Sequence, residues 1–317
     1  NYHGSASHPI SILDGIRHVA AAEIKVLHAM GSPITTKTAI APWSGQDNIT
    51  TRPVAELKAE ALAVAAQADL IIYVGGITAA QEGESFDRDS IELPPEQSDL
   101  IKALHATGKP VVMINCSGSA IALPWEDEHL AAILQAWYPG QAGGRAVADV
   151  LFGFVNPSGH LPITFYRSTA DLPAFTDYAM KNRTYRYFTG QALYPFGHGL
   201  SYTTLDYTNL RVARAAKGAL TVTVEVANTG ARDGDEVVQL YATPPSASQP
   251  QEIRALCGFT RVSLKAGEKR TVTITVPAIA LRRWSIAKKD YEIPAGEWTI
   301  VAGASSADLR QTAKIKL

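Results

Sequence analysis

The first half of the chain alternates short, mostly apolar runs with longer stretches whose apolar residues recur at helical spacing. Residues 70–74 and 111–115 are rich in β-branched and other apolar side chains, which is typical of buried parallel strands. Residues 53–68 and 94–107 carry apolar positions on one helical face, and the second stretch stops at Gly108, a frequent residue after a helix. Strands that alternate with helices predict an α/β fold with a mostly parallel sheet sandwiched by helices.

Further elements of this half are predicted from weaker patterns. They are a helix starting within residues 9–17 with Ser11 as its cap, a strand at 23–29, a short helix at 129–135, a short strand at 136–138 and a glycine-opened helix at 140–151. The glycines at 140, 143 and 144 either bind a phosphate at the helix start or permit close packing against the sheet. The run lacks the lysine and hydroxyl of a nucleotide-binding loop, so packing is favoured.

The second half has a different pattern. Residues 183–188 and 194–202 carry many aromatic side chains with little periodicity, and we expect them to be anchored against another domain. After Tyr207 the apolar period becomes two, in runs separated by Gly, Pro and Asn, which predicts a β-sandwich. The expected strands are 220–226, 236–242, 270–276 and 296–302, and the pattern shows no cluster of titratable residues among them. We therefore expect three parts: an α/β domain at 1–165, an aromatic linker at 166–203 and an all-β domain at 204–317.

Composition narrows the classes of function. The chain has 317 residues, 46% hydrophobic and 19% charged, and a net charge of −1, so a nucleic-acid partner is not expected. No apolar run reaches the length of a membrane span. Cys116 and Cys257 lie far apart and without metal spacing, so both are expected to be buried free thiols, and neither a metal nor a cofactor is implied. The chain opens without Met and is expected to be a mature product or a piece of something longer, with a secreted or periplasmic location favoured over a cytoplasmic one.

An acidic loop follows the first buried strand. Residues 81–88 read QEGESFDR and include the carboxylates Glu82 and Glu84 beside an Asp-Arg pair. In open α/β sheets, ligands bind beyond the carboxyl ends of the strands, where this loop lies. Two neighbouring carboxylates can also push each other's pKa values apart. Taken alone, such a loop is more often a solvated surface feature than a catalytic one.

The chain contains a series of distinctive short runs. They are NYHG at 1–4, LDGI at 13–16, EGESFDR at 82–88 followed by Leu93, Pro94 and Gln97, WYPGQAGG at 137–144, ADVLFG at 148–153, NPSGHLP at 156–162, YPFGHGLSY at 194–202, GFTRV at 258–262, LKAGE at 264–268 and GASSADLR at 303–310. In this order, the runs resemble the C-terminal part of glycoside hydrolase family three, the β-glucosidases, β-xylosidases and related exo-enzymes. The second half is similar to the fibronectin type III-like module of that family.

The resemblance implies a retaining mechanism with two carboxyl groups about 5 Å apart. In the family an N-terminal TIM-type barrel supplies the aspartate nucleophile, and the second domain supplies the general acid/base from the loop that matches residues 81–88. No such barrel is found in these residues. The implied partners are therefore a β-linked oligosaccharide or glycoside substrate and a barrel domain in the same or a separate chain, with no nucleic acid and no membrane. The chain alone is expected to be inactive.

Two assignments stay open at this point. Glu84 keeps the family's spacing to Asp87-Arg88 and is favoured as the general acid/base, with Glu82 as the alternative. The loop has Ser85 where a glycine often stands in the family. The second functional class is a non-catalytic carbohydrate-binding or scaffold protein derived from the family. A family-type barrel encoded directly upstream would separate the two classes.

Overall fold

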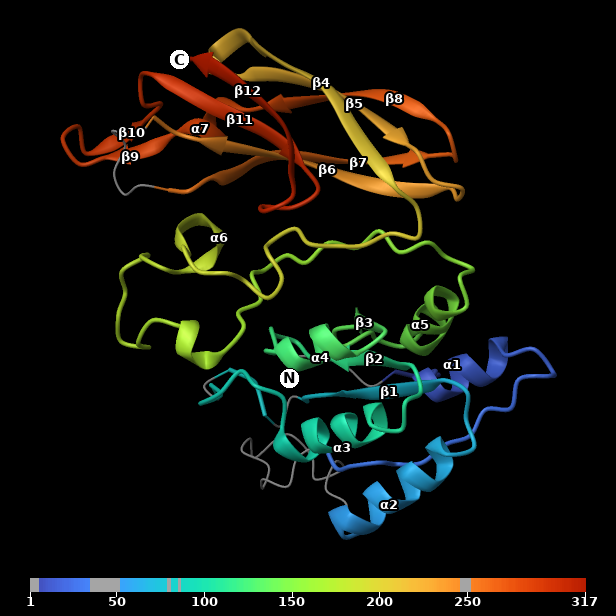
Figure 1. The fold of residues 1–317 in the computed structure, drawn as a ribbon. Helices are drawn as coiled ribbons and strands as arrows, with labels where there is room; N and C mark the ends of the chain where they lie inside the picture. Colours follow the sequence, from blue (N-terminus) through green and yellow to red (C-terminus); the bar gives the residue numbers. More distant parts are fainter. Residues whose placement is uncertain (1–5, 35–51, 79–80, 85–86, 246–251) are drawn as a thin grey trace. The chain divides into compact units, whose positions relative to one another are not determined.

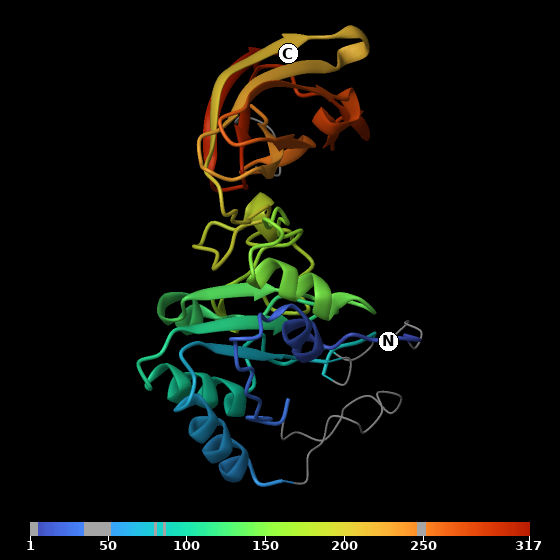
Figure 2. The same ribbon diagram turned by 90° about the vertical axis from the view of Figure 1, so that its right-hand side faces the viewer.

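The computed structural model describes residues 6–34, 52–78, 81–84, 87–245 and 252–317. Two compact units make up the chain, Asn1–Phe154 with Tyr166–Thr169 and Val155–Phe165 with Ala170–Leu317 (Figures 1 and 2). The run NYHG at 1–4 lies outside the described residues. The expected boundaries at 165 and 203 stay a proposal about how the chain is organised.

A parallel three-stranded sheet forms the centre of the first unit. Its order is β1 (Ile71–Gly76), β2 (Val111–Cys116) and β3 (Ala132–Gln135), with β2 in the middle. Met113 and Ile114 of β2 are fully buried. The apolar runs therefore form strands because both faces of the sheet are covered, and the predicted α/β class is confirmed.

Helices cover this sheet on both sides, with α2 and α3 on one face and α5 on the other (Figure 1). Their bounds are α1 (Ile12–Val19), α2 (Val54–Ala65), α3 (Pro95–His105), α4 (Pro124–His129) and α5 (Gly143–Leu151). The expected cap at Ser11 is present, since its hydroxyl accepts the Asp14 N–H at 3.1 Å. Gly108 follows α3 with φ of +76°, a conformation that suits glycine at a helix end.

Three local predictions for this unit are wrong. Residues 23–29 form no strand, and residues 21–25 are exposed, so this stretch has no face to bury against a neighbouring strand. The segment predicted as a helix at 129–135 instead ends α4 and then forms β3, whose pairing with β2 overrides local propensity. The strand expected at 136–138 is excluded because Trp137 has φ of +58°.

The glycine-rich start of α5 serves close packing, as favoured, although the contact is with α1. A Cβ at Gly144 would lie 2.0 Å from the carbonyl oxygen of Ser11, and one at Gly15 would lie 2.0 Å from the carbonyl oxygen of Gly144. These two backbones touch only because neither position has a side chain.

The second unit contains an antiparallel sandwich. One sheet has the order β12-β11-β6-β7 and the other β4-β5-β8, with a separate β9–β10 pair. Trp298 and Leu240 are among the side chains buried completely between the two sheets. The elements are β4 (Leu205–Arg214), β5 (Leu220–Asn228), β6 (Gly234–Thr243), β7 (Ala255–Leu264), β8 (Lys269–Val276), α7 (Ala278–Leu281), β9 (Arg283–Ser285), β10 (Asp290–Glu292), β11 (Glu297–Gly303) and β12 (Leu309–Lys316), with short turns of 3-10 helix at Thr169–Asp171 and Ala216–Gly218.

The aromatic segment is anchored in part. Within the second unit it forms one short helix, α6 (Thr184–Tyr187), and Tyr185 stacks on Phe196 with ring centroids 4.3 Å apart. Tyr185 also meets Tyr241 of β6 edge to face, and its hydroxyl accepts the Leu256 N–H at 3.0 Å. Tyr185 and Phe196 are half-buried and Tyr241 is completely buried, whereas Tyr202 remains 47% exposed.

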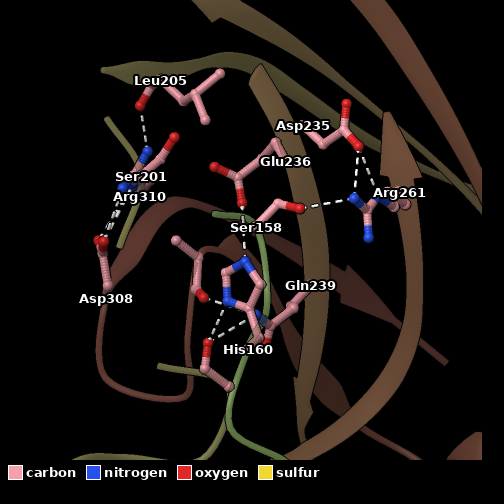
Figure 3. Close-up of polar contacts among 12 residues, drawn as sticks. Ser158, His160, Ser201, Leu205, Asp235, Glu236, Gln239, Arg261, Asp308 and Arg310 are labelled. Atoms are coloured by element: carbon pink, nitrogen blue, oxygen red, sulfur yellow. Dashed lines mark hydrogen bonds and ion pairs between the residues drawn. The ribbon is translucent and has the colours of Figure 1, made fainter. Parts of the chain in front are cut away.

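The second unit also holds a titratable cluster that the sequence pattern did not show (Figure 3). Glu236 of β6 is buried, and its Oε1 lies 3.7 Å from His160 Nε2. His160 Nδ1 donates to the Gly197 carbonyl at 2.6 Å, as does Gln239 at 3.1 Å. Burial raises the pKa of Glu236, and the charges of His160 and Arg310 oppose that rise. The cluster joins the segment before β4 to the sandwich, so we assign it a structural role.

Both cysteines are free; Cys257 is buried and Cys116 is half-buried. Among the described residues, no helix combines the length and the apolar character that a bilayer crossing requires.

Candidate active site

The carboxyl ends of the three parallel strands lie at one edge of the first unit's sheet. In the register of the sheet, Gly76 pairs with Cys116, and Asn115 pairs with Gln135. The acidic loop leaves β1 at this edge, and the segments after β2 and β3 begin beside it. Ligands of open α/β sheets bind at such an edge, so the acidic loop lies where the sequence predicted.

Gln97 of α3 fixes the point where β1 ends. It is 1% exposed, and its amide accepts the Gly76 N–H at 2.9 Å and donates to the Gly76 carbonyl at 2.7 Å. The same amide accepts from the Tyr73 hydroxyl at 3.0 Å and donates to the Ile34 carbonyl at 2.6 Å. Buried polar groups are stabilised only when they are paired, so Gln97 sets the direction in which the chain enters the acidic loop.

A second buried network shapes the turn after β2. Asn115 donates to Gln135 of β3 at 2.6 Å, and Gln135 donates to the Ser117 hydroxyl at 3.1 Å. Ser117 in turn donates to the Ser119 carbonyl at 2.8 Å. Asn115 and Ser117 are completely buried. The turn at residues 117–119 is therefore held rigidly from below, by side chains of both neighbouring strand ends.

Glu82 connects the acidic loop to the segments after β2 and β3. Its Oε1 accepts the Gly118 N–H at 2.6 Å and the Tyr138 hydroxyl at 2.5 Å, and its Oε2 accepts the Ser119 hydroxyl. We refer to Glu82 and these three donors as the Glu82 network. Burial raises the pKa of Tyr138, and donation to the Glu82 carboxylate raises that pKa further. Both oxygens of Glu82 are thus engaged in hydrogen bonds.

Arg88 binds the same turn from the other end of the loop. Its Nη2 donates to the Ser119 hydroxyl at 2.7 Å and to the Ala120 carbonyl at 2.9 Å. Burial lowers the pKa of the Arg88 guanidinium, and the charge of Glu82 opposes this shift. Ser119 accepts from Arg88 and donates to Glu82, so one side chain ties down both ends of residues 82–88.

Glu84 lies between these two attachments and is exposed, as are Asp87 and Asp89. Ser85, the position that departs from the commoner family pattern, lies outside the described residues. The structure thus places the two candidate carboxylates differently. Glu82 points into the turn after β2 and is half-buried, whereas Glu84 is presented to solvent.

Sequence reasoning did not assign a role to Gln97, Ser119 or Tyr138. In the sequence, Gln97 is notable only as part of the run that resembles the family. Its role depends on its near-complete burial on an otherwise apolar helix face, which the sequence pattern does not show. Ser119 and Tyr138 have no local signal, because their partner Glu82 is 37 and 56 residues away. Among the described residues, no group of three or more His, Cys, Asp or Glu side chains is arranged to hold a metal ion.

The sequence and the fold of the chain match those of known proteins. The model of the glycosyl hydrolase family 3 C-terminal domain matches residues 1–202, and that of a fibronectin type III-like domain matches residues 236–306. The chain belongs to glycosyl hydrolase family 3. It is 46% identical over 250 residues to a xylan 1,4-beta-xylosidase of Xylanibacter ruminicola, in an alignment that covers 75% of this chain and 29% of that protein. It is also 36% identical to a periplasmic beta-glucosidase of Salmonella typhimurium, in an alignment of 327 positions that covers 97% of this chain and 43% of that protein.

Solved structures agree with this family 3 assignment. The crystal structure of the GH3 beta-glucosidase of Bifidobacterium adolescentis is similar with a TM-score of 0.86 and 31% identity, over 99% of this chain and 46% of that one. The family 3 chain described here therefore spans less than half the length of each of these three relatives. Its homologues are glycoside hydrolases, and the sandwich of its second unit is the fibronectin type III-like module expected from the sequence.

Proposed function

We propose that this chain is the C-terminal part of a retaining exo-β-glycosidase and supplies its general acid/base, Glu84. The observation that carries the proposal is the attachment of residues 82–88 at both ends, with Glu84 exposed between them. Glu82, the competing carboxylate, has both oxygens engaged by backbone and side-chain donors. A general acid must reach the leaving oxygen of a substrate, and of the two side chains Glu84 is the one presented to solvent.

The reaction then takes two steps. Glu84 donates its proton to the glycosidic oxygen as the bond between that oxygen and the anomeric carbon breaks, while the nucleophile forms a glycosyl ester. Glu84, now a carboxylate, removes a proton from the water that attacks the anomeric carbon and releases the sugar. The nucleophile is an aspartate of an N-terminal barrel, in the same polypeptide or in a separate chain.

The relatives support a proposal for the substrate class. They include a beta-xylosidase and a beta-glucosidase, so we propose that the complete enzyme removes terminal β-linked sugars from oligosaccharides. A panel of nitrophenyl β-glycosides hydrolysed by the complete enzyme would identify the sugar by comparison of kcat/KM.

The test of the catalytic assignment is Glu84→Ala in the complete enzyme. Substrates with a poor leaving group should lose about 10²- to 10⁴-fold in rate, because they depend on protonation. Substrates that release dinitrophenolate should lose far less in their first step, and added azide should restore their turnover and yield a glycosyl azide. Glu56→Ala is the matched control, since Glu56 is an exposed glutamate on α2. A Glu84→Ala enzyme that treats every leaving group as the wild type does would refute the assignment.

The chain on its own should fold and fail to hydrolyse any glycoside, because a lone general acid has no nucleophile to assist. Ordinary turnover of an aryl β-glycoside by the purified 317-residue chain would contradict the proposal. Such turnover would mean that this chain contains its own nucleophile for the anomeric carbon.

A further inference from the structure

We infer that Glu82 is a positioning residue, which holds Glu84 at the place where it transfers the proton. The inference rests on the proposed function of Glu84. Glu82 is bonded to the turn after β2 through Gly118 and Ser119, and to the segment after β3 through Tyr138. It thus joins all three strand-end segments at the carboxyl edge of the sheet.

The rigid side of these contacts is the turn after β2. Ser117 and Asn115 are completely buried and hydrogen bonded beneath it. Gly118 and Ser119 therefore offer Glu82 donors on a turn that buried hydrogen bonds hold in place. The acidic loop, in contrast, is long and reaches the turn through Glu82 at one end and Arg88 at the other. Removing either attachment should loosen the hold on the backbone on one side of Glu84, which costs its preorganisation.

Gly118 shows that the sequence makes room for this contact. A Cβ at Gly118 would lie 2.8 Å from Glu82 Oε1 and 2.8 Å from the Tyr138 ring. Both distances are shorter than van der Waals contact, so a side chain at this position would displace the Glu82 carboxylate and the Tyr138 ring from their places beside the turn. The backbone of Gly118 is not in the left-handed region, and alanine there meets only the steric conflict.

Tyr138 is brought to the network by an unusual backbone. The preceding residue, Trp137, has φ of +58°, a conformation uncommon for a bulky side chain. Non-glycine residues are held in this region only where the surrounding structure demands it, and such positions cluster at functional sites. The turn at Trp137 ends the course of β3 and places the Tyr138 hydroxyl on Glu82.

The chemistry of Glu82 predicts which substitution it tolerates. A glutamine keeps a carbonyl oxygen that accepts from Gly118 and Tyr138, and its amide donates to the Ser119 hydroxyl, which has lone pairs for it. A glutamine cannot transfer a proton. Glu82→Gln therefore retains a positioning role and abolishes a catalytic one, whereas Glu82→Ala abolishes both.

The experiment compares the slope of log(kcat/KM) against leaving-group pKa in the complete enzyme. Glu82→Ala should steepen this slope, with losses of about 10²-fold for poor leaving groups, because the displaced Glu84 protonates them inefficiently. Glu82→Gln should restore the wild-type slope, and Gly118→Ala should steepen it although every carboxylate is still present. In a Glu84→Ala background, Glu82→Ala should change the slope no further.

Other results overturn the inference. Equal losses for all leaving groups in Glu82→Ala, at an unchanged slope, would mean that Glu82 only maintains the folded fraction. A Glu82→Gln enzyme with a steep slope and azide rescue would make Glu82 the acid/base itself. If Glu84→Ala keeps the wild-type slope, the proposed function fails, and the positioning role fails with it. Should Glu82→Ala not fold, Tyr138→Phe and Gly118→Ala decide the question by the same slopes.

Discussion

Replacing Gln97 by leucine should destabilise the first unit at the point where the acidic loop begins. Leucine matches the volume of glutamine but offers neither donor nor acceptor, so the buried Gly76 N–H and C=O lose the side-chain partner that holds them. The Tyr73 hydroxyl loses its bond to Gln97 as well, but Ser32 remains nearby as a second partner.

The magnitude follows from the number of groups left without that partner. Each buried donor or acceptor that loses its partner costs about 1–3 kcal/mol. The two groups of Gly76 are buried with Gln97, whereas the Ile34 carbonyl, which also loses its bond to Gln97, is only partly buried and is not counted. Gln97→Leu should therefore lower the free energy of unfolding by about 2–6 kcal/mol. The matched control is Gln67→Leu. Gln67 is exposed on the turn after α2, where its amide donates to the Ala63 carbonyl at 3.2 Å, so its replacement should change the stability by less than about 0.5 kcal/mol.

Hydrogen–deuterium exchange is the suitable assay, because the chain has two compact units and a single unfolding transition is not assured. Peptides that contain β1 report the free energy of opening of this part of the sheet. Exchange of the β1 amides should accelerate strongly in Gln97→Leu, and that of the sandwich strands should not change. Wild-type protection of β1 in Gln97→Leu, or equal effects of the two leucine variants, would refute the reasoning.

Three further predictions concern stability. Burial raises the pKa of Glu92, but hydrogen bonds from neighbouring hydroxyls and a backbone N–H outweigh burial and lower that pKa to about 2. The stability that Glu92 contributes is therefore present above its unfolded pKa and is lost as pH falls from about 4.5 to about 2. Glu92→Gln should flatten the dependence of the unfolding free energy on pH in this window. Trp298 in the sandwich core is 0% exposed, whereas Trp284 is 49% exposed. In urea unfolding, Trp298→Ala should lower the free energy of unfolding by about 3–5 kcal/mol, and Trp284→Ala should lower it by at most about 1 kcal/mol. Equal losses in the two variants would contradict this prediction. Gly144→Ala places a Cβ 2.0 Å from a carbonyl oxygen of the α1 cap and should lower the melting temperature of the first unit. Gly159→Ala, with no atom within 4 Å of its Cβ, should leave the melting temperature of the second unit, to which Gly159 belongs, unchanged.

The sequence determined the elements whose cause is local. The apolar runs at β1 and β2 are long enough and branched enough to form buried strands in any context that covers both faces. The strict alternation in β5 and β8 likewise predicts half-buried strands of a sandwich. The acidic loop and its place after a strand were also evident, because the motif is contiguous in the chain.

Tertiary structure decided the elements whose local pattern was ambiguous. Residues 132–135 pair with β2 although their composition suits a helix equally well, since the unsatisfied edge of β2 offers backbone hydrogen bonds that a short helix cannot match. Residues 23–29 have the composition of a strand but pair with no strand within the part of the chain that the structure describes, and they remain irregular.

The roles of the two glutamates show the same division. Spacing within the motif ranks Glu84 above Glu82 as the general acid/base. A single stretch of sequence does not show which side chains each glutamate contacts. The donors that engage Glu82 are 36, 37 and 56 residues away, and no local pattern encodes them. They meet because parallel strands in register end at one edge of the sheet, which is a property of the assembled fold and not of any one segment.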